Sequence, residues 1–301
     1  MIASTFEILC LIHQGCDHCV LGITREFALI DSLPPSNLCL MKIAVCVKQV
    51  PDSWAEKKMI NGTLDREGVD VVLNDLDEYA VEEALRIAEA HGGNEEGGAN
   101  TVTIISMGPE RATEAIRKAL SMGANDAILI SDSALAGADA ITTSAVLAKV
   151  IETGGFDLVL CGTESTDARM SVVPAMISAR LGWAQLTFAG SVVVDPAAST
   201  VAITRVTDAG VDSMGASFPA VLSVIEKINE PRYPSFKGIM ASKKKTIDVR
   251  DCAAIGISVQ GAWSVVADSA PRPARAAGIK VTDSGDGGKE LVDFLAGKKL
   301  I

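Results

Sequence analysis

The feature that most constrains the fold is a regular alternation of short apolar runs and segments of helical periodicity. Four apolar runs, 43–47, 101–107, 127–130 and 158–161, are each followed by a segment whose apolar residues recur every three to four positions. Short runs without polar alternation are typical of strands buried on both faces of a parallel sheet. Four such units predict a Rossmann-like α/β core with helices covering both faces of a parallel sheet.

Beyond residue 181 the pattern changes to that of additional β-strands. Three further runs are separated by turn residues and are predicted to be strands joined by hairpins: 187–194, 201–206 and 220–225. They either extend the parallel sheet or stand beside it. From residue 246 onward the apolar periodicity fades, apart from a short helix predicted at about 290–295. We therefore expect an extended C-terminal arm that lies along another chain.

The stretch from Asp157 to Pro174 is the best candidate for a functional site. A buried strand ends at Gly162, a loop rich in hydroxyl groups follows, and helical spacing resumes at Met170. In an open parallel sheet, phosphate groups bind where such a loop enters a helix, because unpaired N–H groups and the helix dipole converge there. The alternative is a tight turn between strand and helix that binds no ligand.

Charge and apolar patterning exclude several classes of protein. The formal net charge of −11 argues against nucleic acid as a partner, because a duplex-binding face needs clustered Lys and Arg. No apolar run approaches the ~20 residues of a transmembrane helix. Seven scattered cysteines do not form a secreted disulfide framework. Together these observations predict a cytoplasmic protein.

Residues 1–40 differ in composition from the rest of the chain. They contain four of the cysteines, and Cys16 and Cys19 have the CxxC spacing of metal ligands, but no second CxxC follows to complete a zinc site. We therefore predict no metal. The segment is interpreted as an N-terminal extension that is either disordered or a mis-assigned start, with Met41 as the working first residue.

From Met41 to its end the chain resembles the beta (small) subunit of electron transfer flavoprotein. Several short motifs carry the resemblance, among them an Asn-Glu-Pro-Arg-Tyr block and a run of three lysines that are specific to the family. The matching segments are 45–52, 74–84, 107–109, 119–124, 160–167, 229–233, 239–241 and 243–245. The resemblance implies an adenine nucleotide α-hydrolase-like version of the parallel-sheet core over residues 41–230.

This resemblance also implies a function. In the family, the beta subunit forms a heterodimer with an alpha subunit that holds the redox-active FAD, and it buries one structural AMP itself. The heterodimer takes electrons from acyl-CoA and related dehydrogenases of fatty acid beta-oxidation and passes them to an acceptor such as a flavoprotein–quinone oxidoreductase. The chain is thus expected to be an electron carrier subunit with no catalytic residues of its own, since the flavin supplies the chemistry.

The family's AMP site carries over onto four short segments of this sequence. The implied cofactor-binding residues are Cys46, Asn74, Asp75, Leu76, Asp77, Met107, Gly162, Thr163, Glu164, Ser165, Thr166, Asp167, Ala168, Arg169, Met170, Ser171, Val172 and Val173. The hydroxyls of Thr163, Ser165 and Thr166 are expected to donate to the phosphate. Asn74 and the backbone at Met107 are expected to recognise the adenine or the ribose.

Residues 231–301 are expected to meet partners. The loop 231–241 resembles the recognition loop that family members insert into dehydrogenases, with Phe236 as its apolar tip, and the arm is expected to pack on the alpha subunit. The implied partner-binding residues are Tyr233, Ser235, Phe236, Ile239 and Met240.

Two departures and two alternatives remain at this point. Many relatives have glycine in place of Ala168 or Ser171, which leaves the phosphate geometry open. Electron-bifurcating members bind a second FAD where others bind AMP, and the loop that begins at Gly162 is similar in sequence in both groups. An adenine-nucleotide-hydrolysing enzyme is the more distant alternative, because residues 48–52 lack the glycines of a pyrophosphate-binding loop.

Overall fold

The computed structural model describes residues 40–301 except 96, 260, 271, 272, 276, 279 and 281. The predictions made for the N-terminal extension, including its CxxC pair, lie outside the described residues. No helix in the described part of the chain is both long enough and apolar enough to cross a membrane.

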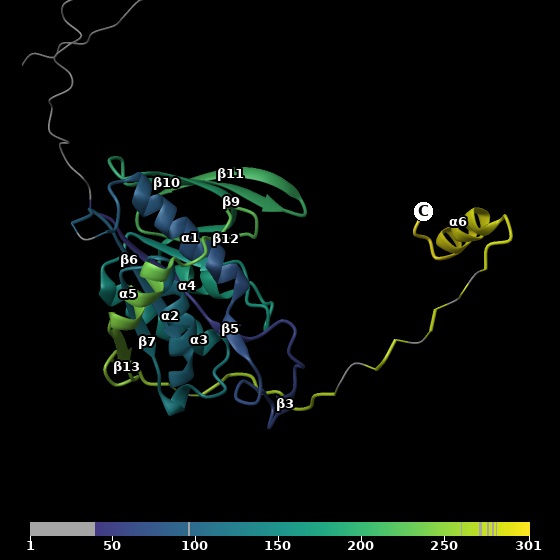
Figure 1. The fold of residues 1–301 in the computed structure, drawn as a ribbon, viewed down its shortest axis with the longest axis horizontal. Coiled ribbons are helices and arrows are strands. Elements are labelled where there is room, and N and C mark those ends of the chain that lie inside the picture. Colours follow the sequence, from purple (N-terminus) through teal and green to yellow (C-terminus); the bar gives the residue numbers. More distant parts are fainter. Residues whose placement is uncertain are drawn as a thin grey trace, which may run out of the picture.

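The described chain forms a Rossmann-like α/β fold around one nine-stranded sheet (Figure 1). Seven adjacent strands run parallel to one another, and the last two strands at one side are joined to them by antiparallel pairing. In sheet order the strands are β11 (Gly210–Ser217), β10 (Thr200–Thr207), β9 (Ala184–Asp195), β12 (Ala220–Val224), β8 (Leu158–Gly162), β1 (Lys42–Cys46), β6 (Thr101–Met107), β7 (Asp126–Ile130) and β13 (Ile247–Arg250).

Helices cover both faces of this sheet, as the alternation of runs predicts. On one face, α1 (Asp75–Ala90) and α2 (Thr113–Met122) bury their apolar residues against alternate strand side chains. On the other face, α3 (Ala140–Gly154) and α4 (Val173–Leu181) form a second core. Strand β1 contributes Ile43 and Val45 to the first core and Ala44 and Cys46 to the second, which explains why its sequence shows no polar alternation.

Short elements between β1 and α1 form an excursion from the sheet. Strand β2 (Gln49–Pro51) pairs with β5 (Val71–Leu73), and β3 (Met59–Ile60) pairs with β4 (Thr63–Leu64). An Asn-Gly pair predicts a two-residue hairpin turn, and the turn between β3 and β4 is formed by Asn61 and Gly62, both with positive φ. Two 3₁₀ turns, η1 (Glu110–Ala112) and η2 (Ser133–Leu135), precede α2 and α3.

The strands that follow α4 differ from the prediction in two ways. Strand β11 was not predicted, because its sequence is polar and glycine-rich and it gains its partners only from the hairpin with β10. Strand β12 was predicted to follow by a hairpin, and this is wrong: it inserts between β8 and β9, parallel to both. All five of its residues are buried there.

The C-terminal region also departs from the prediction. The loop expected over residues 231–241 ends at Ser235, because Ser235 caps a helix, α5 (Phe236–Lys244). Strand β13 was not predicted; it pairs with β7, and Cys252 and Ile255 join the second core. The first part of the arm therefore packs on this chain's own sheet. Helix α6 (Gly287–Gly297) is longer than predicted, and none of its residues is buried.

Candidate functional site

The predicted site residues meet at one edge of the sheet, where β1, β6 and β8 end. Cys46 and Cys161 are register partners at the ends of β1 and β8, and Met107 is the last residue of β6 on the other side of β1. Helix α1 begins beside the loop that follows β8. Parallel strands put their carboxyl ends at the same edge, so four segments distant in sequence come together.

Gly162 makes the closest contact between the strand and α1. A Cβ atom at this position would lie 2.5 Å from Asp77 Oδ1, 2.8 Å from the carbonyl carbon of Leu76 and 2.9 Å from its oxygen. The φ of Gly162 is not in the left-handed region, so the requirement for glycine is steric. Only a residue without a side chain allows β8 to end this close to the first turn of α1.

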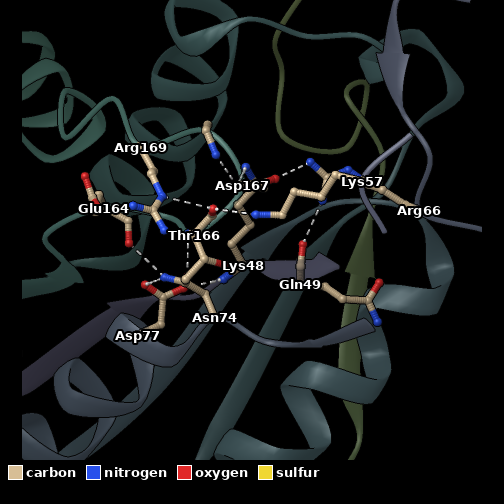
Figure 2. Close-up of polar contacts among 11 residues, drawn as sticks. Lys48, Gln49, Lys57, Arg66, Asn74, Asp77, Glu164, Thr166, Asp167 and Arg169 are labelled. Carbon is tan, nitrogen blue, oxygen red and sulfur yellow. Dashed lines mark hydrogen bonds and ion pairs between the residues drawn. The ribbon is translucent and has the colours of Figure 1, made fainter. Parts of the chain in front are cut away.

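Asn74 holds the loop after β8 in place from inside the protein (Figure 2). Its side chain is fully buried, and its Nδ2 donates to Asp77 Oδ1 and to the carbonyl of Glu164, both at 2.9 Å. Its Oδ1 accepts the N–H of Thr166 at 3.0 Å. Both amide hydrogens are thus used within the chain, and Asn74 contributes to the site by positioning the loop.

Asp77 is a buried carboxylate at the same junction. Its Oδ2 accepts the N–H of Lys48 at 2.7 Å, and its Oδ1 accepts from Asn74. Burial raises the pKa of Asp77 to about 7, although the hydrogen bonds from Asn74 and from the backbone of Lys48 and Gly162 act in the opposite direction. This carboxyl group therefore changes its charge near neutral pH.

Asp167 joins the loop to two cations (Figure 2). Its side chain is only 2% exposed, Lys48 Nζ lies 2.9 Å from Oδ1, and Arg66 Nη2 is paired with Oδ2. Burial acts to raise the pKa of Asp167, but the charge of Lys48 and the hydrogen bonds from Arg66 and Ser165 outweigh it and hold the pKa well below its usual range. The carboxylate is therefore ionised at neutral pH.

The excursion 52–70 lies over the loop and was not part of the predicted site. Besides Arg66, it contributes Lys57, whose Nζ donates to the carbonyl of Thr166 at 3.4 Å. Arg111, in η1, supports the excursion by donating to the carbonyl of Arg66 at 2.9 Å. Lys48 had a sequence signal, since it directly follows a buried strand. The other cations had none, because only the tertiary fold brings them here.

The loop residues themselves have different environments. The N–H and the hydroxyl of Thr163 both donate to the carbonyl of Val224, at 3.0 and 2.6 Å, so this hydroxyl is engaged with β12 and not with the loop. The hydroxyl of Ser171 donates to Glu164 Oε2 at 3.2 Å. Arg169 and Ser171 have φ of 51° and 55°, a conformation that glycine adopts without strain. A glycine at position 171 would adopt this backbone without strain.

We expect an Asp167→Asn variant to loosen the loop, because Lys48 and Arg66 each lose a charged partner. Amide hydrogens of residues 163–172 should exchange about tenfold faster, and those of the excursion should also exchange faster. Hydrogen-exchange mass spectrometry measures both. Asp208→Asn, in the exposed turn between β10 and β11, is the matched control. Equal protection in the two variants would contradict the role of Asp167.

The described residues form no assembled site for cysteine or metal chemistry. Cys46, Cys161 and Cys252 are buried free thiols, and a hydrogen bond with Cys46 together with burial raises the pKa of Cys161. No group of three or more His, Cys, Asp or Glu side chains within this part of the chain is placed to bind a metal ion. What the edge of the sheet offers is a rigid loop, the N-terminus of α4 and two nearby cations, a combination suited to an anion.

Comparison with known proteins finds a family model and several relatives that match most of the chain. The family model described as "Electron transfer flavoprotein domain" matches residues 61–255. "Electron transfer flavoprotein subunit beta" of Mycobacterium leprae is 48% identical over 270 residues, which cover 87% of this chain and 100% of that protein. The protein of the same name from Thermoanaerobacterium thermosaccharolyticum is 35% identical, with the same two coverages. "Protein FixA" of Azotobacter vinelandii is 35% identical over 247 residues, 77% of this chain and 85% of that protein.

Proposed function

The chain belongs to the electron transfer flavoprotein family, as a beta subunit, and from this premise we propose that it binds AMP structurally at the edge formed by β1, β6 and β8. The proposed cofactor-binding residues are those at 46, 74–77, 107 and 162–173. The observation that carries the proposal is the way Gly162, Asn74 and Asp167 together hold the loop 163–172 against the start of α1. A loop held from three sides presents its N–H groups in a preformed arrangement.

The residues present fit a nucleoside monophosphate. The side chains of Lys48 and Arg66 are 40% and 32% exposed beside the loop, and α4 begins at its end. Backbone N–H groups and the helix N-terminus favour the phosphate. With bound AMP the site would be a structural element of the fold, and this chain supplies binding and positioning without a chemical step.

The remainder of the function is proposed for a heterodimer. An alpha subunit would hold the FAD, which accepts and donates electrons, and this chain would complete the environment of that flavin. We further propose that acyl-CoA and related dehydrogenases dock on the segment 233–240, and that a flavoprotein–quinone oxidoreductase or a similar protein accepts the electrons. The exposed part of the C-terminal arm, including α6, is proposed to pack on the alpha subunit.

The two alternative ligands make different demands on the site. A bifurcating flavoprotein would hold a second FAD here, and its longer diphosphate would extend toward Lys48 and Arg66. A hydrolase of adenine nucleotides needs a pyrophosphate-binding loop after β1, whereas this chain has strand β2 and Pro51 at that position.

Nucleotide content tests the proposal. The full chain would be co-expressed with the alpha subunit of its own organism, the complex purified, and the ligands released with acid and separated by chromatography. We expect one FAD and one AMP per heterodimer. Two FAD and no AMP would overturn the AMP assignment in favour of the bifurcating class. Two chains that never co-purify would overturn the heterodimer.

A further inference from the structure

Helix α5 exposes an apolar face that nothing in the described chain covers. Tyr233 and Phe236 are 97% and 80% exposed, and Ile239 and Met240 are about 40% exposed. Residues three and four positions apart lie on one side of a helix, so Phe236, Ile239 and Met240 share a face, and Tyr233 precedes it by one turn. A row of exposed large apolar side chains of this kind is typical of an interaction site.

The opposite face of α5 packs tightly on α2. A Cβ atom on Gly238 would lie 2.5 Å from the carbonyl oxygen of Ser121, and Ser242, one turn further along, is buried. The absence of a side chain at Gly238 lets the two helices approach closely. The hydroxyl of Ser235 accepts the N–H of Gly238 at 3.0 Å and caps the first turn.

Arg117 of α2 holds the C-terminal end of α5. Its guanidinium donates to the carbonyl of Ser242, in the last turn, and to that of Lys245, the residue that caps the helix. A cation at this position also complements the negative end of the helix dipole. The ammonium of Lys245 in turn donates to the carbonyl of Ala124.

Arg232 holds the chain where it enters α5. Its Nε and Nη2 donate to the two oxygens of Glu82 at 2.7 and 2.9 Å, and its guanidinium also reaches Glu89. Glu82 is buried on α1, so the carboxylate side of this two-pronged ion pair is shielded from water. Asn229, three residues earlier, donates to Glu83 Oε2 at 3.0 Å and to the carbonyl of Tyr79.

We propose that Arg117 and Arg232 are positioning residues that hold α5 ready formed, so that its exposed face enters an apolar pocket of a partner dehydrogenase without first becoming ordered. The inference rests on the docking role in the proposed function and adds the residues that make docking efficient. Two cations, one at each end, tie the docking helix to α2 and α1. A binding element that is already ordered avoids the entropy cost of ordering side chains and backbone on association.

The test measures electron transfer and helix order separately. The heterodimer carrying Arg117→Ala or Arg232→Ala would be reduced by an acyl-CoA dehydrogenase and its substrate, and amide exchange over residues 236–245 would be measured on the same samples. We expect the KM for the heterodimer to rise about tenfold with kcat within about twofold of wild type. Amide exchange in α5 should become faster, while nucleotide content stays unchanged.

Matched variants separate the possible causes. Arg117→Lys should have a KM close to that of wild type, because an ammonium still donates to helix-end carbonyls. Arg232→Lys should show a raised KM, because lysine cannot form the two-pronged contact with Glu82. Phe236→Ala removes the face itself and should raise the KM without faster exchange. Arg250→Ala, which loses an exposed pair with Asp248, is the control and should behave as wild type.

The results distinguish the docking role of the exposed face from the positioning role of the two arginines. A normal KM in Phe236→Ala would overturn the docking face, and with it this part of the proposed function. A raised KM in Phe236→Ala with a normal KM in both arginine variants would leave docking intact and overturn the positioning role. Unchanged exchange in α5 after loss of either arginine would show that these contacts do not hold the helix, whatever the kinetics.

Discussion

Replacing Gly162 with alanine is expected to destabilise the fold by about 3 kcal/mol and to abolish retention of the nucleotide. The added methyl group would meet Asp77 Oδ1 at 2.5 Å and the peptide group of Leu76 at 2.8–2.9 Å. Two of these three atoms are backbone at the start of α1, so relief requires the whole first turn to move away from β8. That movement would break the contacts through which Asn74 and Asp77 hold the loop.

Chemical denaturation and acid release of bound nucleotide measure the two parts of this effect. Gly215→Ala is the matched control, because Gly215 also lies in a strand, has no positive φ, and its Cβ would find only ordinary contacts at 3.7 Å and beyond. We expect the control to stay within about 0.5 kcal/mol of wild type. A Gly162→Ala protein as stable as the control, with normal AMP content, would refute the close packing described here.

Asp77 is expected to make stability fall as the pH rises from about 4 to about 7. Its pKa is about 7 in the folded chain, against 3.8 for the exposed side chain, so the folded state binds the proton more tightly than the unfolded state. The stabilisation from the protonated form is complete below pH 4 and is lost as the pH rises through 7. The shift corresponds to a change on the order of 4 kcal/mol in the free energy of unfolding.

The comparison of wild type with Asp77→Asn isolates this effect, since the amide does not titrate. The free energy of unfolding would be measured by denaturant titration at several pH values for both proteins. We expect the wild type to lose stability relative to the variant between pH 4 and 7, with little further change above pH 8. Parallel pH profiles would contradict the assignment. Asp167, the other buried carboxylate of the site, has the opposite pH dependence, because its pKa is lowered and its contribution to stability is lost as the pH falls.

Much of the fold could be predicted because its signals are local. Strand β6 has the predicted bounds, and the apolar residues of α1 and α2 that were expected to face inward are buried. Each of these predictions depends on periodicity within about ten to fifteen residues, which reflects the geometry of a single helix or strand. The same local logic identified the hairpin at Asn61-Gly62, where both residues need positive φ.

The location of the candidate site was also accessible from sequence, because parallel strands necessarily end at one edge. The contacts that shape it were not. Lys48 and Asp167 are 119 residues apart, and Arg66 and Asp167 are 101 apart. No local pattern marks such pairs, since an isolated lysine or arginine after a strand or in a loop is most often solvated. Asn74 was predicted to recognise the nucleotide, and the hydrogen bonds by which it also holds the loop had no sequence signal.

The sequence by itself determined the class of fold, the edge where the candidate site lies, and membership of the family. The tertiary structure alone decided where β11, β12 and β13 pair, which residues hold the loop after β8, and how Arg232 reaches Glu82 across 150 residues. The physical reason is the range of the interactions. Helix and strand formation depends on neighbouring residues, while strand order and buried ion pairs depend on which surfaces meet after the chain has folded.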